Sequence, residues 1–204
     1  MFFRVPVILI GAEAPGLSAD RSAPRLFAPR AGGTACQCLP LYIAYFIWRG
    51  SKSSTKAQKG VPSLVNANDE RFLSPKNMTE EIKKACAESR QQVPSTSGEM
   101  AAVIYKSLAA CYGNTIKEIS ANTGKQYKVL HIIGGGCKNR YLNKLTADAT
   151  GLTVLAGPSE ATAIGNAMVQ MIEDGALADL MAARETVHKS FDIEVFNPKG
   201  GERC

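Results

Sequence analysis

The sequence has little with which to bind a metal or build a disulfide framework. Two histidines, His131 and His188, occur among 204 residues, and the six cysteines include no C-x-x-C pair. Cys36 and Cys38 form a C-x-C, and no second pair completes a zinc site. Scattered cysteines suit a reducing compartment better than secretion. We therefore expect a cytoplasmic protein without a metal site of its own.

Long apolar runs are also missing. Val5–Ile10 is interrupted by Pro6 and is shorter than the core of a typical secretory signal. Leu39–Trp48 covers about ten residues, whereas a helix that spans a bilayer needs about twenty. The sequence predicts no membrane anchor.

The positive charge is confined to the start of the chain. The net charge is +6, and residues 1–60 hold eight Lys and Arg against two acidic residues, so residues 61–204 are balanced. A nucleic-acid-binding surface on that balanced part has no electrostatic support. A basic nucleic-acid-binding head remains the weakest alternative, because the aromatic residues of 42–48 lie in an apolar run and not among the charges. We expect no nucleic-acid partner.

Composition divides the chain into three parts. Residues 1–60 contain five prolines and no apolar period, and end in a Ser/Lys-rich linker, which predicts an irregular, poorly ordered extension. Residues 61–198 are regular and predict a folded domain. Residues 199–204 are a tail.

Two helices are predicted at the start of the folded domain. Asn77 followed by Glu80, and Thr96 followed by Glu99, have the spacing of capping boxes. The first helix should end at Pro94. The second is long, has a buried face of apolar residues at helical spacing, and should end at Gly124.

The second half alternates strands and helices. We predict a buried strand, a helix with Leu142, Leu145 and Ala149 inward, a second strand, and a helix whose small residues pack on the sheet. Their ranges are strand Lys128–Ile133, helix Asn139–Thr150, strand Leu152–Leu155, helix Glu160–Asp174, helix Leu177–Lys189 and extended Phe191–Phe196. This order argues for an α/β fold with at least partly parallel strands.

Gly134-Gly135-Gly136 joins the first of these strands to its helix. Glycines at this position let the backbone approach a flat ligand or a phosphate, since they have no Cβ and accept positive φ angles. The helix start behind them offers free N–H groups and a partial positive charge, and Lys138 adds a cation. Such turns are common for packing reasons too, so spacing alone is a weak signal for a nucleotide.

Two other nucleotide motifs are disfavoured. A dinucleotide fingerprint needs a glycine where Asn139 stands and an acidic residue after the next strand, which ends Val154-Leu155-Ala156. The P-loop pattern G-x-x-x-x-G-K-[ST] does not occur in the sequence.

Several segments together resemble the FGGY carbohydrate kinases, a family in the actin/Hsp70/sugar-kinase superfamily. Leu130–Asn139 is similar to their adenosine-binding motif, and Thr146–Gly151 and Ala156–Asn166 are similar to the stretches that follow it. Ser63–Phe72 is similar to the approach to this domain. The Ala-Gly-Pro-Ser-Glu-Ala opening at Ala156 narrows the resemblance to one branch. The resemblance as a whole covers about two-thirds of the chain, and it implies a ribonuclease H-like C-terminal domain.

The resemblance implies ATP-dependent phosphorylation of a sugar hydroxyl, with Mg²⁺ on the phosphates. In this family an Asp from the first half of the protein takes the hydroxyl proton, and the C-terminal domain supplies the adenosine side of the cleft. Carried over, Gly135 is the best single nucleotide contact. Gly134 and Gly136 shape the loop, and Asn139 could hydrogen-bond at the helix start.

The departures from the family lie upstream of Ser63. That stretch matches neither the phosphate-binding loops nor the sugar site nor the Asp base, and a full-length kinase of this family is more than twice as long. We therefore assign no catalytic residue and expect the chain alone to be inactive. The alternative is a non-catalytic nucleotide-binding fragment, or a half-protein that needs a separate N-terminal half before it can meet a sugar. Either would expose an apolar interdomain face and tend to self-associate.

Three other residues are interpreted as structural. Cys137 has no neighbouring His or acid to activate it as a nucleophile. His131 lies within a strand, where a core histidine is more common than a base. Glu160 stands at a helix start, where the helix dipole favours an acid.

Overall fold

The computed structural model describes residues 7–11, 61–73 and 75–200. The predictions for residues 12–60 and 201–204 lie outside this range. Along the described chain the elements are β1 (Val7–Gly11), η1 (Glu70–Phe72), α2 (Met78–Glu88), α3 (Ser97–Thr123), β2 (Val129–Ile133), η2 (Gly134–Lys138), α4 (Arg140–Thr150), β3 (Thr153–Ala156), α5 (Ala161–Glu173), α6 (Leu180–Ser190) and β4 (Glu194–Phe196).

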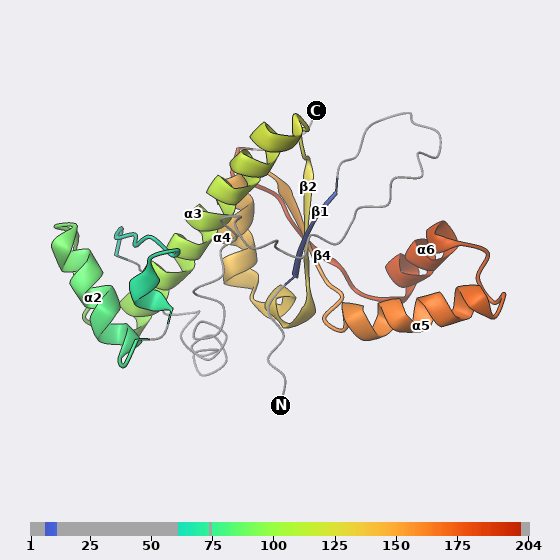
Figure 1. Cartoon of the computed structure of the whole chain (residues 1–204), viewed down its shortest axis with the longest axis horizontal. Coiled ribbons are helices and arrows are strands. Elements are labelled where there is room, and N and C mark those ends of the chain that lie inside the picture. Colours follow the sequence, from blue (N-terminus) through green and yellow to red (C-terminus); the bar gives the residue numbers. More distant parts are fainter. Residues whose placement is uncertain (1–6, 12–60, 74, 201–204) are drawn as a thin grey trace.

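A four-stranded sheet with the order β1-β2-β3-β4 forms the centre of the molecule (Figure 1). β2 and β3 are parallel, with Val129 opposite Thr153 and Ile132 opposite Ala156, and α4 connects them. β1 and β4 pair antiparallel on the two outer sides. The predicted α/β architecture with partly parallel strands is confirmed.

β1 was not predicted from the sequence. Val7–Gly11 pairs antiparallel with Val129–Ile133, so the expectation of irregular structure is wrong for these five residues. Pro6 and the lack of a period argued against a strand. Four consecutive β-branched or aliphatic residues after that proline are nevertheless enough for a short edge strand.

The caps of α2 and α3 follow the sequence. Asn77 Oδ1 accepts hydrogen bonds from the backbone N–H groups of Thr79 and Glu80 at 3.1 and 3.4 Å. Thr96 and Glu99 form a reciprocal capping box, and α3 ends at Gly124 in the left-handed conformation, φ 65°.

The predicted end of α2 at Pro94 is wrong. The helix ends at Glu88, because Arg90 adopts a positive φ of 55° and reverses the chain. The N–H of Gln91 donates to Cys86 O at 2.9 Å, and the N–H of Arg90 donates to Ala87 O at 3.0 Å. This is the hydrogen-bond pattern of a Schellman motif, here without the usual glycine.

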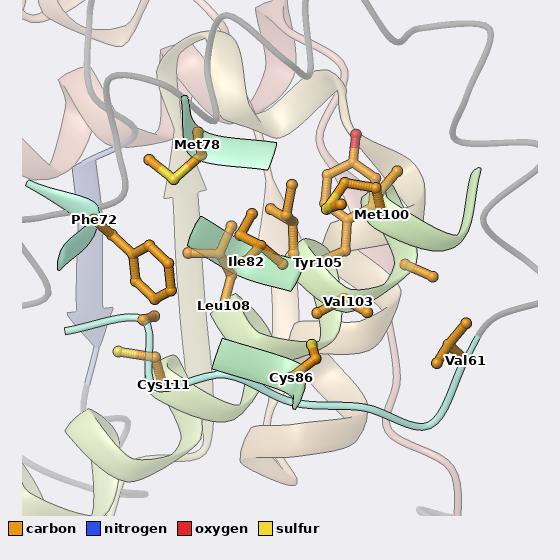
Figure 2. Packing of buried hydrophobic residues seen from close by; sticks show 14 of the residues in the cluster. Val61, Phe72, Met78, Ile82, Cys86, Met100, Val103, Tyr105, Leu108 and Cys111 are labelled. Atoms are coloured by element: carbon orange, nitrogen blue, oxygen red, sulfur yellow. The ribbon is translucent and has the colours of Figure 1, made fainter. Parts of the chain in front are cut away.

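A first hydrophobic core joins α2, α3 and the segment from Val61 to Phe72 (Figure 2). Phe72 and Cys86 are almost fully buried, at 1% and 0% exposure, and α3 contributes its apolar face, as predicted. The labelled members in Figure 2 are Val61, Phe72, Met78, Ile82, Cys86, Met100, Val103, Tyr105, Leu108 and Cys111. This core holds the helical end of the molecule together.

A second core lies on one face of the sheet. Leu130 and Ile132 of β2 and Val154 and Ala156 of β3 are buried there with Ile116, Ala147 and Phe196. The alternate residues of both strands are only half-buried. The strand predicted to be buried is therefore buried on one face.

The buried stripe of α4 differs from the prediction. Leu142 is inward as expected, but Ala149 is exposed, and Asn143 and Thr146 are fully buried instead. The sequence reasoning followed the apolar residues, whereas two buried polar side chains shift the inward face around the helix.

The close crossing of α3 and α4 depends on Gly113. A Cβ built on Gly113 would lie 2.9 Å from the backbone oxygen of Ala149. Real Cβ atoms do not approach a carbonyl oxygen this closely, so only glycine allows the two helices their observed separation.

α5 and α6 lie side by side beyond the sheet, on the side away from α3 and α4 (Figure 1). α5 has no buried residue, so the prediction that its small residues pack against the sheet is wrong. Large apolar side chains are exposed on the pair, among them Val169 at 60% and Met181 at 67%. In the described residues, no helix is both long and apolar enough to cross a bilayer.

Asp148 ties α4 to the chain beyond β4. Its carboxylate contacts Lys144 Nζ at 3.0 Å and accepts from the Lys199 N–H at 2.8 Å. Burial acts to raise the pKa of Asp148, but the hydrogen bonds from Lys144 and Lys199 and their charges outweigh it and hold that pKa below its ordinary value.

We predict that Gly113→Ala destabilises the fold. The overpacked methyl group should cost about 1–3 kcal/mol against a gain in helix propensity of about 1 kcal/mol. Gly165→Ala on α5 is the matched control, because nothing lies within 4 Å of its added Cβ, and it should be neutral or stabilising. Urea unfolding of both variants measures this, and equal stabilities would contradict the tight crossing.

We predict that Asp148→Asn reduces the acid sensitivity of folding. A carboxyl whose folded pKa is lowered stabilises the fold above its unfolded pKa, about 3.9, and this contribution is lost as the pH falls through the folded pKa. The unfolding free energy of the wild type should therefore fall more steeply below about pH 4 than that of the variant. Asp192→Asn, which removes an exposed carboxylate, controls for net charge. Parallel curves for wild type and Asp148→Asn would refute the prediction.

Candidate functional site

The glycine turn is the short helix η2, Gly134–Lys138, between β2 and α4. Gly134 has a positive φ of 78°, and its N–H donates to Pro158 O at 3.2 Å. The turn closes where the N–H of Asn139 donates to Gly136 O at 3.1 Å. The strand–glycine–helix arrangement predicted from the sequence is confirmed.

The glycines of this turn differ in what the fold requires. Gly134 needs to be glycine because of its positive φ. Gly135 is exposed, and a Cβ built on it would meet no protein atom within 4 Å. Because packing does not demand glycine at position 135, the missing side chain leaves its backbone open to an external group.

Asn139 is the N-cap of α4. Its Oδ1 accepts from the Leu142 N–H at 3.1 Å, and its side chain also hydrogen-bonds Tyr105 of α3. Burial raises the pKa of Tyr105 more than this hydrogen bond lowers it. Tyr105 in turn packs edge-on against Tyr141, with 5.7 Å between ring centroids. Asn139 therefore fixes the helix start against α3, and contact with a ligand stays a prediction.

Asn143 was missed by the sequence reasoning. It is fully buried one turn into α4, and its Nδ2 donates to Cys137 O in the glycine turn at 2.7 Å. The available signal was an asparagine in a helix interior four residues after another asparagine, a residue type that usually avoids such positions.

The remaining side chains around the turn behave as structural or electrostatic groups. Cys137 is half-buried, and burial raises the pKa of its thiol more than Lys138 lowers it, so the thiol is a poor nucleophile. Lys138 is exposed and lies next to the positive end of α4. Glu160 stands at the N-cap of α5 without a capping hydrogen bond from its side chain.

The glycine turn forms an open surface and does not line either of two hollows elsewhere in the described chain. Two shallow hollows occur along Leu64–Phe72, one against α2 and one against α3, and neither is lined by a residue of the turn. No group of three or more His, Cys, Asp or Glu side chains among the described residues is placed to hold a metal ion. The surface of the glycine turn therefore offers backbone groups, a helix start and Lys138, which suit a flat ring or a phosphate.

Residues 48–173 match a protein family described as the FGGY family of carbohydrate kinases, C-terminal domain. The match covers more than half of the chain and includes the glycine turn.

Curated relatives agree with this match. The chain is 47% identical over 150 residues to a rhamnulokinase of Bacillus subtilis, which covers 72% of this chain and 31% of that protein. It is 46% identical over 135 residues to a rhamnulokinase of Enterococcus faecalis, covering 65% and 27%, and 43% identical over 135 residues to one of Enterobacter sp., covering 66% and 28%. The matched segment thus spans about 30% of the length of these relatives.

Proposed function

The chain belongs to the FGGY family of carbohydrate kinases, as a C-terminal domain, and we propose that it supplies the adenosine side of the ATP cleft of a rhamnulokinase. The narrower resemblance at Ala156–Asn166 was to rhamnulokinases, and the relatives that match carry this name. The proposal includes the ribonuclease H-like fold of the actin/Hsp70/sugar-kinase superfamily for residues 61–198, and a cytoplasmic location.

The glycine turn is the observation that carries the proposal. The adenosine of ATP lies against Gly134, Gly135 and Gly136, with Gly135 nearest, because its backbone is exposed and nothing in the fold occupies the space of its Cβ. The positive end of the α4 dipole and the charge of Lys138 favour the phosphate side of the nucleotide. Asn139 keeps the helix start in place and offers its amide edge.

The reaction of the whole kinase is the transfer of the γ-phosphoryl group of ATP to the 1-hydroxyl of L-rhamnulose. The Asp base and the sugar site come from the first half of such an enzyme by family resemblance, so this chain binds and orients the nucleotide and moves no proton. Mg²⁺ would bind the phosphates of ATP. The described residues around the turn offer no carboxylate cluster for it, and we assign it no ligand in this chain.

We predict that Gly135→Ala weakens nucleotide binding without weakening the fold. The added methyl group has open space inside the protein but occupies the surface against which the adenosine would lie. The dissociation constant of a fluorescent ATP analogue should rise about tenfold or more, since a displaced contact of about 1.4 kcal/mol gives this factor.

Gly165→Ala is the matched control for this experiment, because it adds the same methyl group at an exposed glycine of α5. It should leave the dissociation constant unchanged. Equal affinities for wild type and Gly135→Ala, in samples with equal melting temperatures, would remove Gly135 from the site.

A second candidate function is a non-catalytic module, or a half-protein that acts with a separate N-terminal half. The exposed apolar side chains of α5 and α6 favour it, because a surface of this kind is usually covered by a partner. We propose that the chain on its own self-associates through this face, and that a sugar binds only when an N-terminal half is supplied.

We predict no detectable phosphorylation of L-rhamnulose by the purified 204-residue polypeptide at saturating ATP and Mg²⁺. A coupled assay for ADP measures turnover, and circular dichroism confirms that the sample is folded. Light scattering on the same sample should show species larger than a monomer. Turnover would show that the chain supplies a base and a phosphate clamp, and a monodisperse monomer would contradict the proposed self-association.

A further inference from the structure

The position of Asn143 costs folding stability. It is fully buried in the interior of α4, where asparagine is unfavourable for the helix. Its Oδ1 has no hydrogen-bond partner among the described residues. A leucine would suit the helix better and would bring no acceptor of its own, but the Cys137 carbonyl would lose the donor that Asn143 supplies. The contribution of the asparagine that no apolar side chain could replace is therefore this donor.

Within the described part of the chain, the one hydrogen bond of the Asn143 side chain goes to the glycine turn. Its Nδ2 donates to Cys137 O at 2.7 Å, from inside the helix that follows the turn. The turn has no side-chain cap at Ile133, and its other tethers in the described chain are backbone bonds at its two ends. Asn143 thus tethers the C-terminal part of the turn to α4.

The Cys137 side chain packs against the second core, but packing does little to fix Gly134 and Gly135. A Cβ at Gly135 would have no neighbour within 4 Å, and at Gly134 it would meet only Ser159 O, at 4.0 Å. Glycines have the widest backbone freedom of all residues, so Gly134 and Gly135 keep their conformation largely through the hydrogen bonds of the turn. Removal of the hydrogen bond from Asn143 to Cys137 should let the turn sample other conformations.

We propose that Asn143 is a positioning residue for nucleotide binding: its amide holds the Cys137 carbonyl and so presents the backbone of Gly135 to the nucleotide. The consequence for affinity rests on the proposed function. For a ligand that binds only one conformation of a turn, the apparent dissociation constant equals the intrinsic constant divided by the fraction of molecules in that conformation. A loosened turn therefore weakens binding without the loss of a direct contact.

The test compares Asn143→Leu with Thr146→Val. Thr146 is the matched control, since it is also fully buried on α4, and its Oγ1 donates to Leu142 O at 2.8 Å, within the helix and away from the turn. Asn143→Ala, which removes the donor without adding a branched side chain, gives the same comparison should the leucine variant fail to fold.

Two measurements follow the turn without any nucleotide. Amide hydrogen exchange of Gly134–Asn139 and the alkylation rate of Cys137, resolved from the other thiols by peptide mass spectrometry, should both rise about fivefold or more in the Asn143 variants and less than twofold in Thr146→Val. Equal rates in the two kinds of variant, at matched global stability, would overturn the inference.

The third measurement is the dissociation constant for the fluorescent ATP analogue. It should rise about tenfold in Asn143→Leu and stay within about twofold in Thr146→Val. An unchanged affinity together with a loosened turn would overturn the positioning role. Absence of binding by the wild-type chain would defeat the proposed function, and the exchange and alkylation rates would still decide whether Asn143 holds the turn.

Discussion

The parallel pairing of β2 with β3 determines most of the geometry around the glycine turn. Parallel neighbours cannot be joined by a tight hairpin, so the chain has to leave β2, cross over and return to enter β3 from the same end. α4 makes this crossing and packs on the face of the sheet that holds Leu130 and Val154. The turn therefore lies at the carboxyl end of β2 and directly before the positive end of a helix. The Gly113 crossing and the Asn143 hydrogen bond both depend on where α4 is placed by this pairing.

Local signals in the sequence located the elements well. The Thr96–Glu99 capping box, the end of α3 at the left-handed Gly124, and the short apolar run before the glycine triplet lie at the predicted places. Each of these signals acts within a few residues, so the sequence carries its cause and its effect together. The sequence resemblance to the FGGY family rested on the same stretch and is supported by the family match.

Features set by distant contacts were not predictable in this way. The inward face of α4 follows from what lies beneath it, and so Asn143 and Thr146 are buried while Ala149 is exposed. The small residues of α5 indicated close packing, but in this chain they meet no sheet. The roles of Gly135 and Asn139 as ligand contacts stay predictions, because an open surface does not show which ligand binds to it. The segment matched in its relatives covers about 30% of their length.

The β1–β2 pair also bears on how the protein is made. Val7 of β1 is paired with Ile133 of the neighbouring strand β2, so more than a hundred residues of chain separate the two strands. During synthesis the N–H and C=O groups of Val7–Gly11 have no strand to pair with until β2 has left the ribosome. At about 5–20 residues per second, this delay lasts roughly 6–25 s. Such a long-range closure slows folding and leaves an unpaired strand open to other chains in the meantime.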